Sequence, residues 1–171
     1  HVLVSDTIYS TLLTRERQEL HGRVAEAIEK LYSDRLDEQI DVLARHYFWS
    51  DYLDRALHYL ILAGQKSIRD FNTGQSKKYF EGALSILAKV NYSNEQALQV
   101  YIGLGDALVL AGDYPKARSA FEDASRMLMA NAGVNIETAC NLQRKNAMTY
   151  ESQGDYDQVL ISLESARQIL L

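Results

Sequence analysis

The sequence predicts an all-helical protein, and three observations lead to this prediction. The chain of 171 residues contains a single proline, Pro115, and long helices exclude proline from their interiors whereas loop-rich and β-rich domains use it freely. Apolar residues recur at spacings of three and four along almost the whole chain, which is the period of one helix face. The segment GDYPKARSAFEDA at 112–124 returns as GDYDQVLISLESA at 154–166. This recurrence indicates a chain built from repeated units.

The apolar period places eight helices along the chain. They are expected, in order, at about 15–33, 36–49, 53–71, 74–90, 94–111, 114–130, 135–152 and 156–170. The first 35 residues form N-terminal helices that would join a missing upstream domain. Residues 36–171 form the repeats, with hairpins at 36–71, 94–130 and 135–171 and a helix at 74–90 that does not follow the repeat.

Cap residues support several of these boundaries. Ser93–Gln96 and Asp155–Gln158 each read as a capping box, in which the first side chain accepts from an early helix N–H and the glutamine reaches back. Gly112 and Gly154 suit the left-handed residue that ends a helix. Pro115 falls in the first turn of its helix, where its missing N–H is harmless.

The repeated segment has the spacing of small and large residues that packed helical hairpins need. In the better copy the positions in register are Tyr101, Leu104, Gly105, Leu108, Ala117, Phe121 and Ala124. A second copy keeps Tyr150, Leu163 and Ala166, with Ala147 in place of the glycine, and departs from the pattern at Gln143, Asn146 and Val159. A third, more degenerate copy counted from Asp37 keeps Leu43, Ala44, Tyr47, Ala56, Leu60 and Ala63.

This spacing resembles the tetratricopeptide repeat. The resemblance implies antiparallel hairpins stacked as a right-handed superhelix, with a concave wall that binds a peptide or another domain. The alternative is an amphipathic helical bundle whose spacings match by chance. The wall-facing positions expected to contact a partner are Gln99, Ile102, Asp106, Val109, Asn141, Arg144, Met148 and Glu151. The same positions are also compatible with ordinary solvated surface. They do not reproduce the Lys/Asn clamp with which chaperone-binding repeats hold a terminal carboxylate.

Residues 1–70 carry a second resemblance. The features are His1-x-Leu3 before YSTLL, Arg17, Leu20-His21 before VAEAIE, LARHY at 43–47 and ALHYLILAG at 56–64. They look like the segment that follows the ATPase in bacterial signal-transduction ATPases with numerous domains, which are often linked to nucleotide cyclase or DNA-binding output domains. That resemblance implies a helical sensor or regulatory arm. The chain itself contains no G-x-x-x-x-G-K-[ST] motif, so the phosphate cradle of the ATPase would lie elsewhere.

Composition limits the classes of partner. Eighteen Lys and Arg against 23 Asp and Glu give a net charge of −5 without a basic block, which disfavours nucleic-acid binding. The longest apolar runs fall far short of the roughly 20 residues that cross a bilayer, so no membrane partner is expected. The single cysteine, Cys140, cannot form an internal disulfide and suits a cytoplasmic location.

The residues that could form a catalytic or metal site are better explained by structural roles. His21, His46 and His58 do not pair at metal-ligand spacing, and Cys140 has no neighbouring His or Lys cluster. The carboxylates Glu26, Glu29, Asp34, Asp37 and Glu38 are expected on solvated faces near helix starts. In the aromatic run HYFWSDY at 46–52, Tyr47 is expected to pack the hairpin turn and Trp49 to fill the joint with the next helix. The alternative is an exposed docking patch.

The expected function is therefore a non-enzymatic protein-interaction module, without catalytic residues, metal or cofactor. It would be the arm of a cytoplasmic signalling ATPase or, alternatively, a free-standing adaptor for a peptide or protein. A hydrolytic or metal-dependent enzyme is the rival from another class. Self-association through exposed helical ends is also expected.

Overall fold

A computed structural model describes residues 12–129 and 135–170, and this part of the chain contains helices but no strand. Its elements are α2 (Thr14–Leu31), the 3-10 turn η1 (Leu36–Gln39), α3 (Ile40–Phe48), α4 (Leu53–Arg69), α5 (Thr73–Leu87), α6 (Asn94–Leu110), α7 (Tyr114–Met129), α8 (Ile136–Glu151) and α9 (Tyr156–Ile169). All eight predicted helices are present, with ends displaced by one to three residues at most positions. The prediction of an all-α protein is confirmed.

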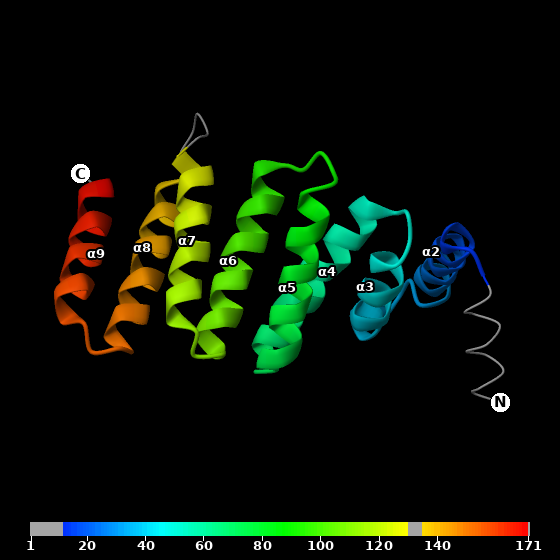
Figure 1. The fold of residues 1–171 in the computed structure, drawn as a ribbon, viewed down its shortest axis with the longest axis horizontal. Helices are drawn as coiled ribbons and strands as arrows, with labels where there is room; N and C mark the ends of the chain where they lie inside the picture. Colours follow the sequence, from blue (N-terminus) through cyan, green and yellow to red (C-terminus); the bar gives the residue numbers. More distant parts are fainter. Residues whose placement is uncertain (1–11, 130–134, 171) are drawn as a thin grey trace.

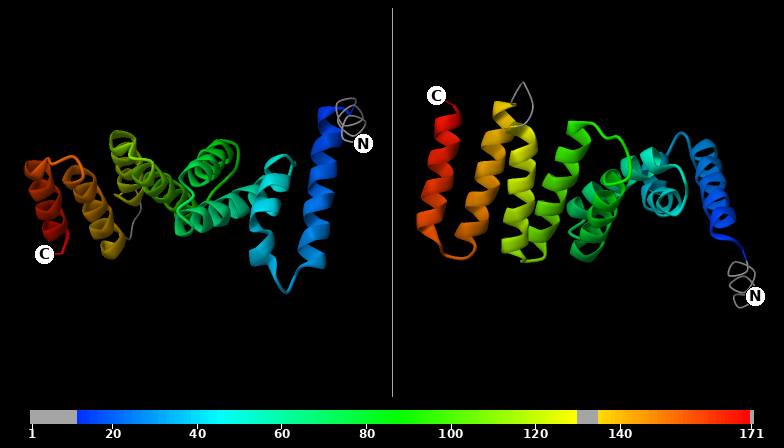
Figure 2. Two further views of the ribbon diagram at one scale, coloured as in Figure 1. Left: turned by 90° about the horizontal axis from the view of Figure 1, so that it is seen from below. Right: turned by 45° about the horizontal axis from the view of Figure 1, so that its top comes forward.

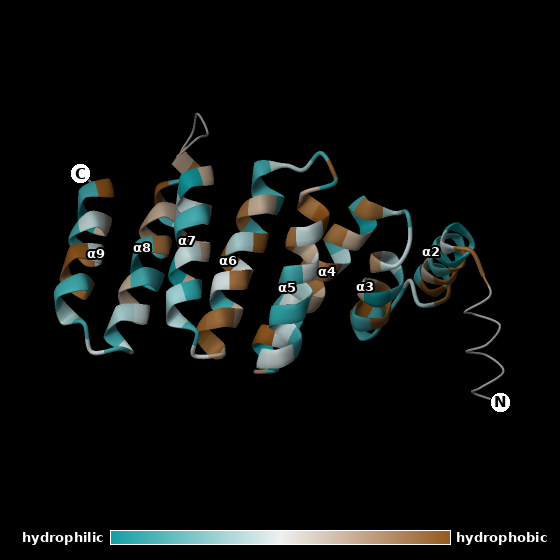
Figure 3. Ribbon diagram, viewed as in Figure 1, coloured by the Kyte–Doolittle hydropathy of each residue, from teal (hydrophilic) through white to brown (hydrophobic). Residues whose placement is uncertain are grey.

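The helices form an elongated row, with α2 at one end and α9 at the other (Figure 1). Each helix packs against its neighbours in sequence, and α4 also reaches α6. Two further views show the same order along the row (Figure 2). Apolar and polar residues alternate along the helices (Figure 3), as expected where each helix buries one side against its neighbours.

The turns after α4, α6 and α8 are the same structure built three times. Each has a residue of positive φ, namely Phe71 (53°), Gly112 (75°) and Gly154 (75°). The next residue in each turn donates its backbone N–H to a carbonyl five residues earlier, over distances of 2.8–3.0 Å. The same residue accepts from the N–H three positions later; these caps are Asn72, Asp113 and Asp155. Repetition at this level of detail shows that α4–α5, α6–α7 and α8–α9 are equivalent hairpins.

This grouping differs from the expected one. The expected hairpin at 36–71 pairs α3 with α4 and leaves 74–90 outside the repeat, whereas α5 is a regular helix joined to α4 by the repeated turn. The sequence does not show that this turn matches the other two, because Phe71 occupies the positive-φ position that glycine takes in them. The turn chemistry therefore places α3 before the first complete hairpin, although α3 also packs against α4.

Each of the first two hairpins is closed by an aromatic ring on a glycine. A Cβ on Gly64 would meet the ring of Phe80 at 2.6 Å, and a Cβ on Gly105 would overlap the ring of Phe121. Both rings are completely buried. Glycine at these positions lets the two helices approach closely enough to enclose the ring, so the pair decides how tightly each hairpin closes.

The two end helices leave apolar side chains in solvent. The predicted stripe of α2 is largely exposed at Leu20, Val24 and Leu31, and the buried residues of this helix are Gly22 and Ala25. A Cβ on Gly22 would overlap the ring of Tyr52, so a larger residue there would displace that ring. The face of α2 that is buried is therefore the one whose small residues allow close packing, and not the one that carries the predicted apolar stripe.

Replacing Phe71 with glycine is expected to stabilise the protein by about 1 kcal/mol. Phe71 is 78% exposed and held at φ 53°, a conformation that costs an ordinary residue about 1–2 kcal/mol, part of which glycine's greater unfolded-state freedom offsets. The change in unfolding free energy is measured by urea denaturation. Gly112→Ala is the matched control and should be destabilising by a similar amount; stabilisation by both substitutions would contradict the equivalence of the turns.

Candidate functional site

Three of the four partner-binding residues predicted on α6 line one groove. The groove has a volume of about 330 Å³ and lies between α4 and α6. Its lining residues are Gln65, Ile68 and Arg69 of α4 with Gln99, Ile102, Gly103 and Asp106 of α6. The fourth predicted residue, Val109, lies one turn further along α6 and is half-buried. We call this the α4–α6 groove.

The contribution of α4 to this groove was missed by the sequence reasoning. Gln65 precedes Asp106 by forty-one residues and Ile68 precedes Val109 by the same interval, as Phe80 precedes Phe121. This interval was available in the sequence. The degenerate copy expected at 36–71 instead makes α4 the second helix of its hairpin, and the second helix does not line the partner-binding wall.

Asp106 is less available to a partner than expected. Its carboxylate forms an ion pair with Lys145 of α8, and the two side chains are only 29% and 20% exposed. The Lys145 ammonium also lies 5.8 Å from the centre of the Phe121 ring. This contact joins the second hairpin to the third and neutralises the charge that a partner would otherwise meet.

The four predicted residues on α8 are all exposed and follow one face of that helix. Arg144 donates to Asn141 Oδ1 over 2.9 Å, and its other terminal nitrogen lies 3.5 Å from Met148 Sδ. Glu151 lies one turn beyond Met148. These side chains form a polar strip on α8, separate from the residues that line the α4–α6 groove.

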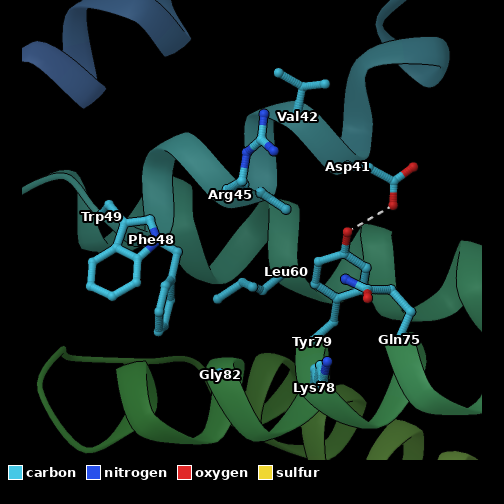
Figure 4. Close-up of a pocket in the computed structure, with 11 residues that line it drawn as sticks. Asp41, Val42, Arg45, Phe48, Trp49, Leu60, Gln75, Lys78, Tyr79 and Gly82 are labelled. Carbon is cyan, nitrogen blue, oxygen red and sulfur yellow. Dashed lines mark hydrogen bonds between the residues drawn. The ribbon is translucent and has the colours of Figure 1, made fainter. Parts of the chain in front are cut away.

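A second groove lies between α3 and α5, over the side chain of Leu60 of α4 (Figure 4). It has a volume of about 430 Å³. Phe48 and Trp49 form one wall, with their rings edge to face at a centroid distance of 5.3 Å. Trp49 is 59% exposed, so the expectation that it fills a buried joint is wrong. Tyr47 is buried as predicted, because neighbouring residues of a helix point in different directions.

Asp41 closes one end of this second groove. It accepts from Lys66 Nζ over 2.8 Å and from the Tyr79 hydroxyl over 2.9 Å, and the latter bond is drawn in Figure 4. Burial alone would raise the pKa of Asp41, but the hydrogen bonds from Lys66 and Tyr79 and the charge of Lys66 outweigh it and leave the pKa lowered. The carboxylate is therefore charged and already paired.

His21 of α2 and His46 of α3 meet, which their separation in the sequence did not indicate. Their Nδ1 atoms are 3.0 Å apart. Burial, followed by the charge of Arg45, lowers the pKa of His21, and burial, His21 and Arg45 lower that of His46. Across residues 12–129 and 135–170, no group of three or more His, Cys, Asp and Glu side chains is placed to hold a metal ion.

Glu29 lies in a half-buried cluster and not on a solvated face as expected. Its carboxylate, 16% exposed, accepts from the hydroxyls of Tyr47 and Tyr59 over 2.7 and 2.6 Å and from Arg55 over 2.7 and 2.9 Å. The rings of Tyr47 and Tyr59 are stacked at 5.4 Å. The cluster joins α2 to α3 and α4, and both carboxylate oxygens of Glu29 accept hydrogen bonds within it, which favours a structural role.

Cys140 packs within the third hairpin. Its Sγ lies 3.5 Å from the backbone carbonyl oxygen of Ala166, so the thiol contacts α9 from α8. This contact agrees with a helix-packing role for the side chain.

The two grooves are suited to non-covalent binding, because each is lined by apolar residues together with charged side chains. In the described ranges, no helix is both long and apolar enough to cross a bilayer. No protein-family model, curated protein or solved structure matches the chain.

Proposed function

We propose that the protein is a non-catalytic interaction module that binds a peptide or protein segment in the α4–α6 groove. The observation that carries the proposal is the repetition of one hairpin three times, together with the packing of α4 against α6, the first helices of the first two hairpins. Repeats of this kind, arranged like tetratricopeptide repeats in a right-handed superhelix, usually bind partners on the wall lined by the first helix of each hairpin.

The chemistry of the groove favours a segment with both apolar and polar contacts. Ile68 and Ile102 supply apolar surface, while Gln99 and Arg69 supply hydrogen-bond donors at the rim. Gly103 packs against the buried ring of Phe80, which holds α6 close to the first hairpin. The exposed strip of Asn141, Arg144 and Met148 on α8 would extend the contact along the row.

A photo-crosslinking amino acid at Gln99 tests this assignment. We expect it to capture a discrete partner in extracts of the source cells, because Gln99 is exposed and lines the groove. The matched control carries the same amino acid at Glu122, which is exposed on α7 outside the groove. Equal capture from both positions would contradict binding in the α4–α6 groove, as would the failure of Ile102→Glu to reduce the affinity of the captured partner.

The larger context proposed for this module is the sensor or regulatory arm of a cytoplasmic signalling ATPase, on the resemblance of residues 1–70. A partner in the groove would then bias the parent protein between two states by binding them with different affinities. A P-loop in the polypeptide upstream of His1, together with ATP binding, would support this context. A parent protein that lacks the P-loop and does not bind ATP would leave the free-standing adaptor.

A further inference from the structure

The groove between α3 and α5 has the size and the lining of a site for a small molecule. Its volume of about 430 Å³ falls in the range of about 300–1,000 Å³ that is typical of pockets for small ligands. Phe48 projects from α3 toward Gly82 of α5, over the side chain of Leu60 (Figure 4). The exposed Trp49 extends this apolar wall. The interior therefore suits a compact apolar group such as a ring.

Gly82 leaves a hollow in the α5 side of this groove. A Cβ at this position would stand 3.5 Å from Leu60 Cδ2 and 3.5 Å from Phe48 Cε2, and both are ordinary contact distances. A methyl group would therefore fit there, and its absence leaves space for a ligand against both side chains. Phe48 and Trp49, edge to face at 5.3 Å, add aromatic surface to this end of the groove.

The charged residues that line the groove indicate the polar group of its ligand. Asp41 accepts from Tyr79 and Lys66, so its charge is already compensated within the protein. Arg45 of α3 and Lys78 of α5 are exposed, and neither forms an ion pair with any residue in 12–129 or 135–170. Both side chains carry hydrogen-bond donors and no acceptor. The group that complements them is an anion.

We propose that the groove between α3 and α5 binds a small amphipathic carboxylate, a molecule with one apolar ring and one carboxylate group. The ring would fill the hollow at Gly82 against Phe48 and Leu60, and the carboxylate would accept hydrogen bonds from Arg45 and Lys78. Such charge-assisted bonds are stronger than neutral ones, and a planar guanidinium can engage both carboxylate oxygens. The groove shares no lining residue with the α4–α6 groove, so this ligand is distinct from the partner in the proposed function.

The fluorescence of Trp49, the only tryptophan in the chain, reports on occupancy because Trp49 lines the groove. The probe is cyclohexanepropanoate, which does not absorb where tryptophan is excited. We expect a saturable blue shift of the emission, since a bound ring excludes water from the indole, with a Kd of about 0.1–1 mM for a ligand of this size. Cyclohexanepropanol, which lacks the charge, should bind about tenfold more weakly. The corresponding amine should give no shift, because the cations repel it.

Lys78→Gln and Arg45→Gln test the contact with the carboxylate without changing the apolar interior. Each is expected to lower the affinity for cyclohexanepropanoate about threefold, the effect of one exposed charge pair. The double variant should bind the acid and the alcohol about equally, and the affinity for the alcohol should stay the same throughout. Lys77→Gln is the matched control on α5, because Lys77 pairs with Glu81 at 3.8 Å and does not line the groove. It should leave both affinities unchanged.

Gly82→Ala tests the position of the ring. Alanine is the better helix former, so weaker binding could not be ascribed to unfolding. We expect the affinities for the acid and the alcohol to fall together by about tenfold, the effect of one methylene-sized change in an apolar pocket. Gly74→Ala is the matched control, since its Cβ meets no other atom within 4 Å. Trp49 also borders a neighbouring cavity, but Gly82 does not, so this pair of variants locates the ligand.

The proposal is overturned if cyclohexanepropanoate leaves the emission unchanged well above the expected Kd, or if the alcohol binds as tightly as the acid. Equal losses from Lys78→Gln and Lys77→Gln, or from Gly82→Ala and Gly74→Ala, would place the ligand outside this groove. None of the substituted residues lines the α4–α6 groove, so failure here leaves the crosslinking result at Gln99 unaffected.

Discussion

Gly105→Ala is expected to destabilise the protein by about 2–3 kcal/mol, although alanine is normally the better helix former. The added Cβ would stand well inside 3.0 Å of the Phe121 ring, which is completely buried and has no space to withdraw into. Overpacking of this kind forces the side chain off its rotamer or the helices apart. Chemical denaturation followed by far-UV circular dichroism measures the loss.

A smaller residue at position 121 is expected to restore the stability lost by Gly105→Ala, because it removes the ring that the added Cβ would meet. The third hairpin carries Ala147 and Leu163 at the positions of Gly105 and Phe121, so the chain already contains the alternative pair. Phe121→Leu alone is expected to cost about 1–2 kcal/mol through the cavity it leaves. In that background Gly105→Ala should cost almost nothing, which corresponds to a coupling of about 2 kcal/mol in a double-mutant cycle.

A simple sum of the two single effects would contradict the Gly105–Phe121 contact. Gly74→Ala on α5 serves as the control for the effect of a methyl group alone, because nothing lies near its Cβ. It should be neutral or slightly stabilising.

Glu29→Ala is expected to cost about 3 kcal/mol, and the loss should begin at α2. Removal of the carboxylate leaves the hydroxyls of Tyr47 and Tyr59 without their acceptor, and an unsatisfied buried polar group costs about 1–3 kcal/mol. Because a row of helices is held by nearest-neighbour contacts, hydrogen exchange should show the loss of protection in α2 before α6–α9. Glu19→Ala, exposed on the same helix, is the control and should change stability by less than about 0.5 kcal/mol.

The same cluster predicts a loss of stability in acid. Burial alone would raise the pKa of Glu29, but hydrogen bonds from Tyr59 and Tyr47 and the charge of Arg55 leave it lowered. For a carboxyl with a lowered pKa, the stabilisation is fully present above the ordinary value of about 4.3 and is lost as the pH falls through the folded value. Glu29→Gln should remove this part of the pH dependence.

His21 and His46 add a separate loss in acid, which Glu29→Gln leaves in place. Their pKa values are lowered in the fold, so the unfolded chain takes up protons first and stability declines below about pH 6.5. A pH profile of Glu29→Gln that matched the unaltered protein below about pH 4.3 would show that the carboxylate does not stabilise the folded state.

The sequence by itself determined the secondary structure and the repeated hairpin. Helix formation depends on local features that can be recognised in the sequence. These are the apolar period, the capping box at Ser93 and Gln96, and the glycines at 112 and 154. The interval between Phe121 and Leu163 marked the last two hairpins. The first complete hairpin escaped notice because Phe71 replaces a glycine at the turn.

Only the tertiary structure decided which side chains meet. Glu29 and Tyr59 are 30 residues apart in the sequence, and His21 and His46 are 25 apart. The helix period alone does not say how far one helix is rotated or shifted against another. That rotation buries Tyr47 and leaves its neighbour Trp49 exposed. The α4–α6 groove and the groove between α3 and α5 arise in the same way, because each is lined by helices whose relative placement depends on packing between residues distant in the chain.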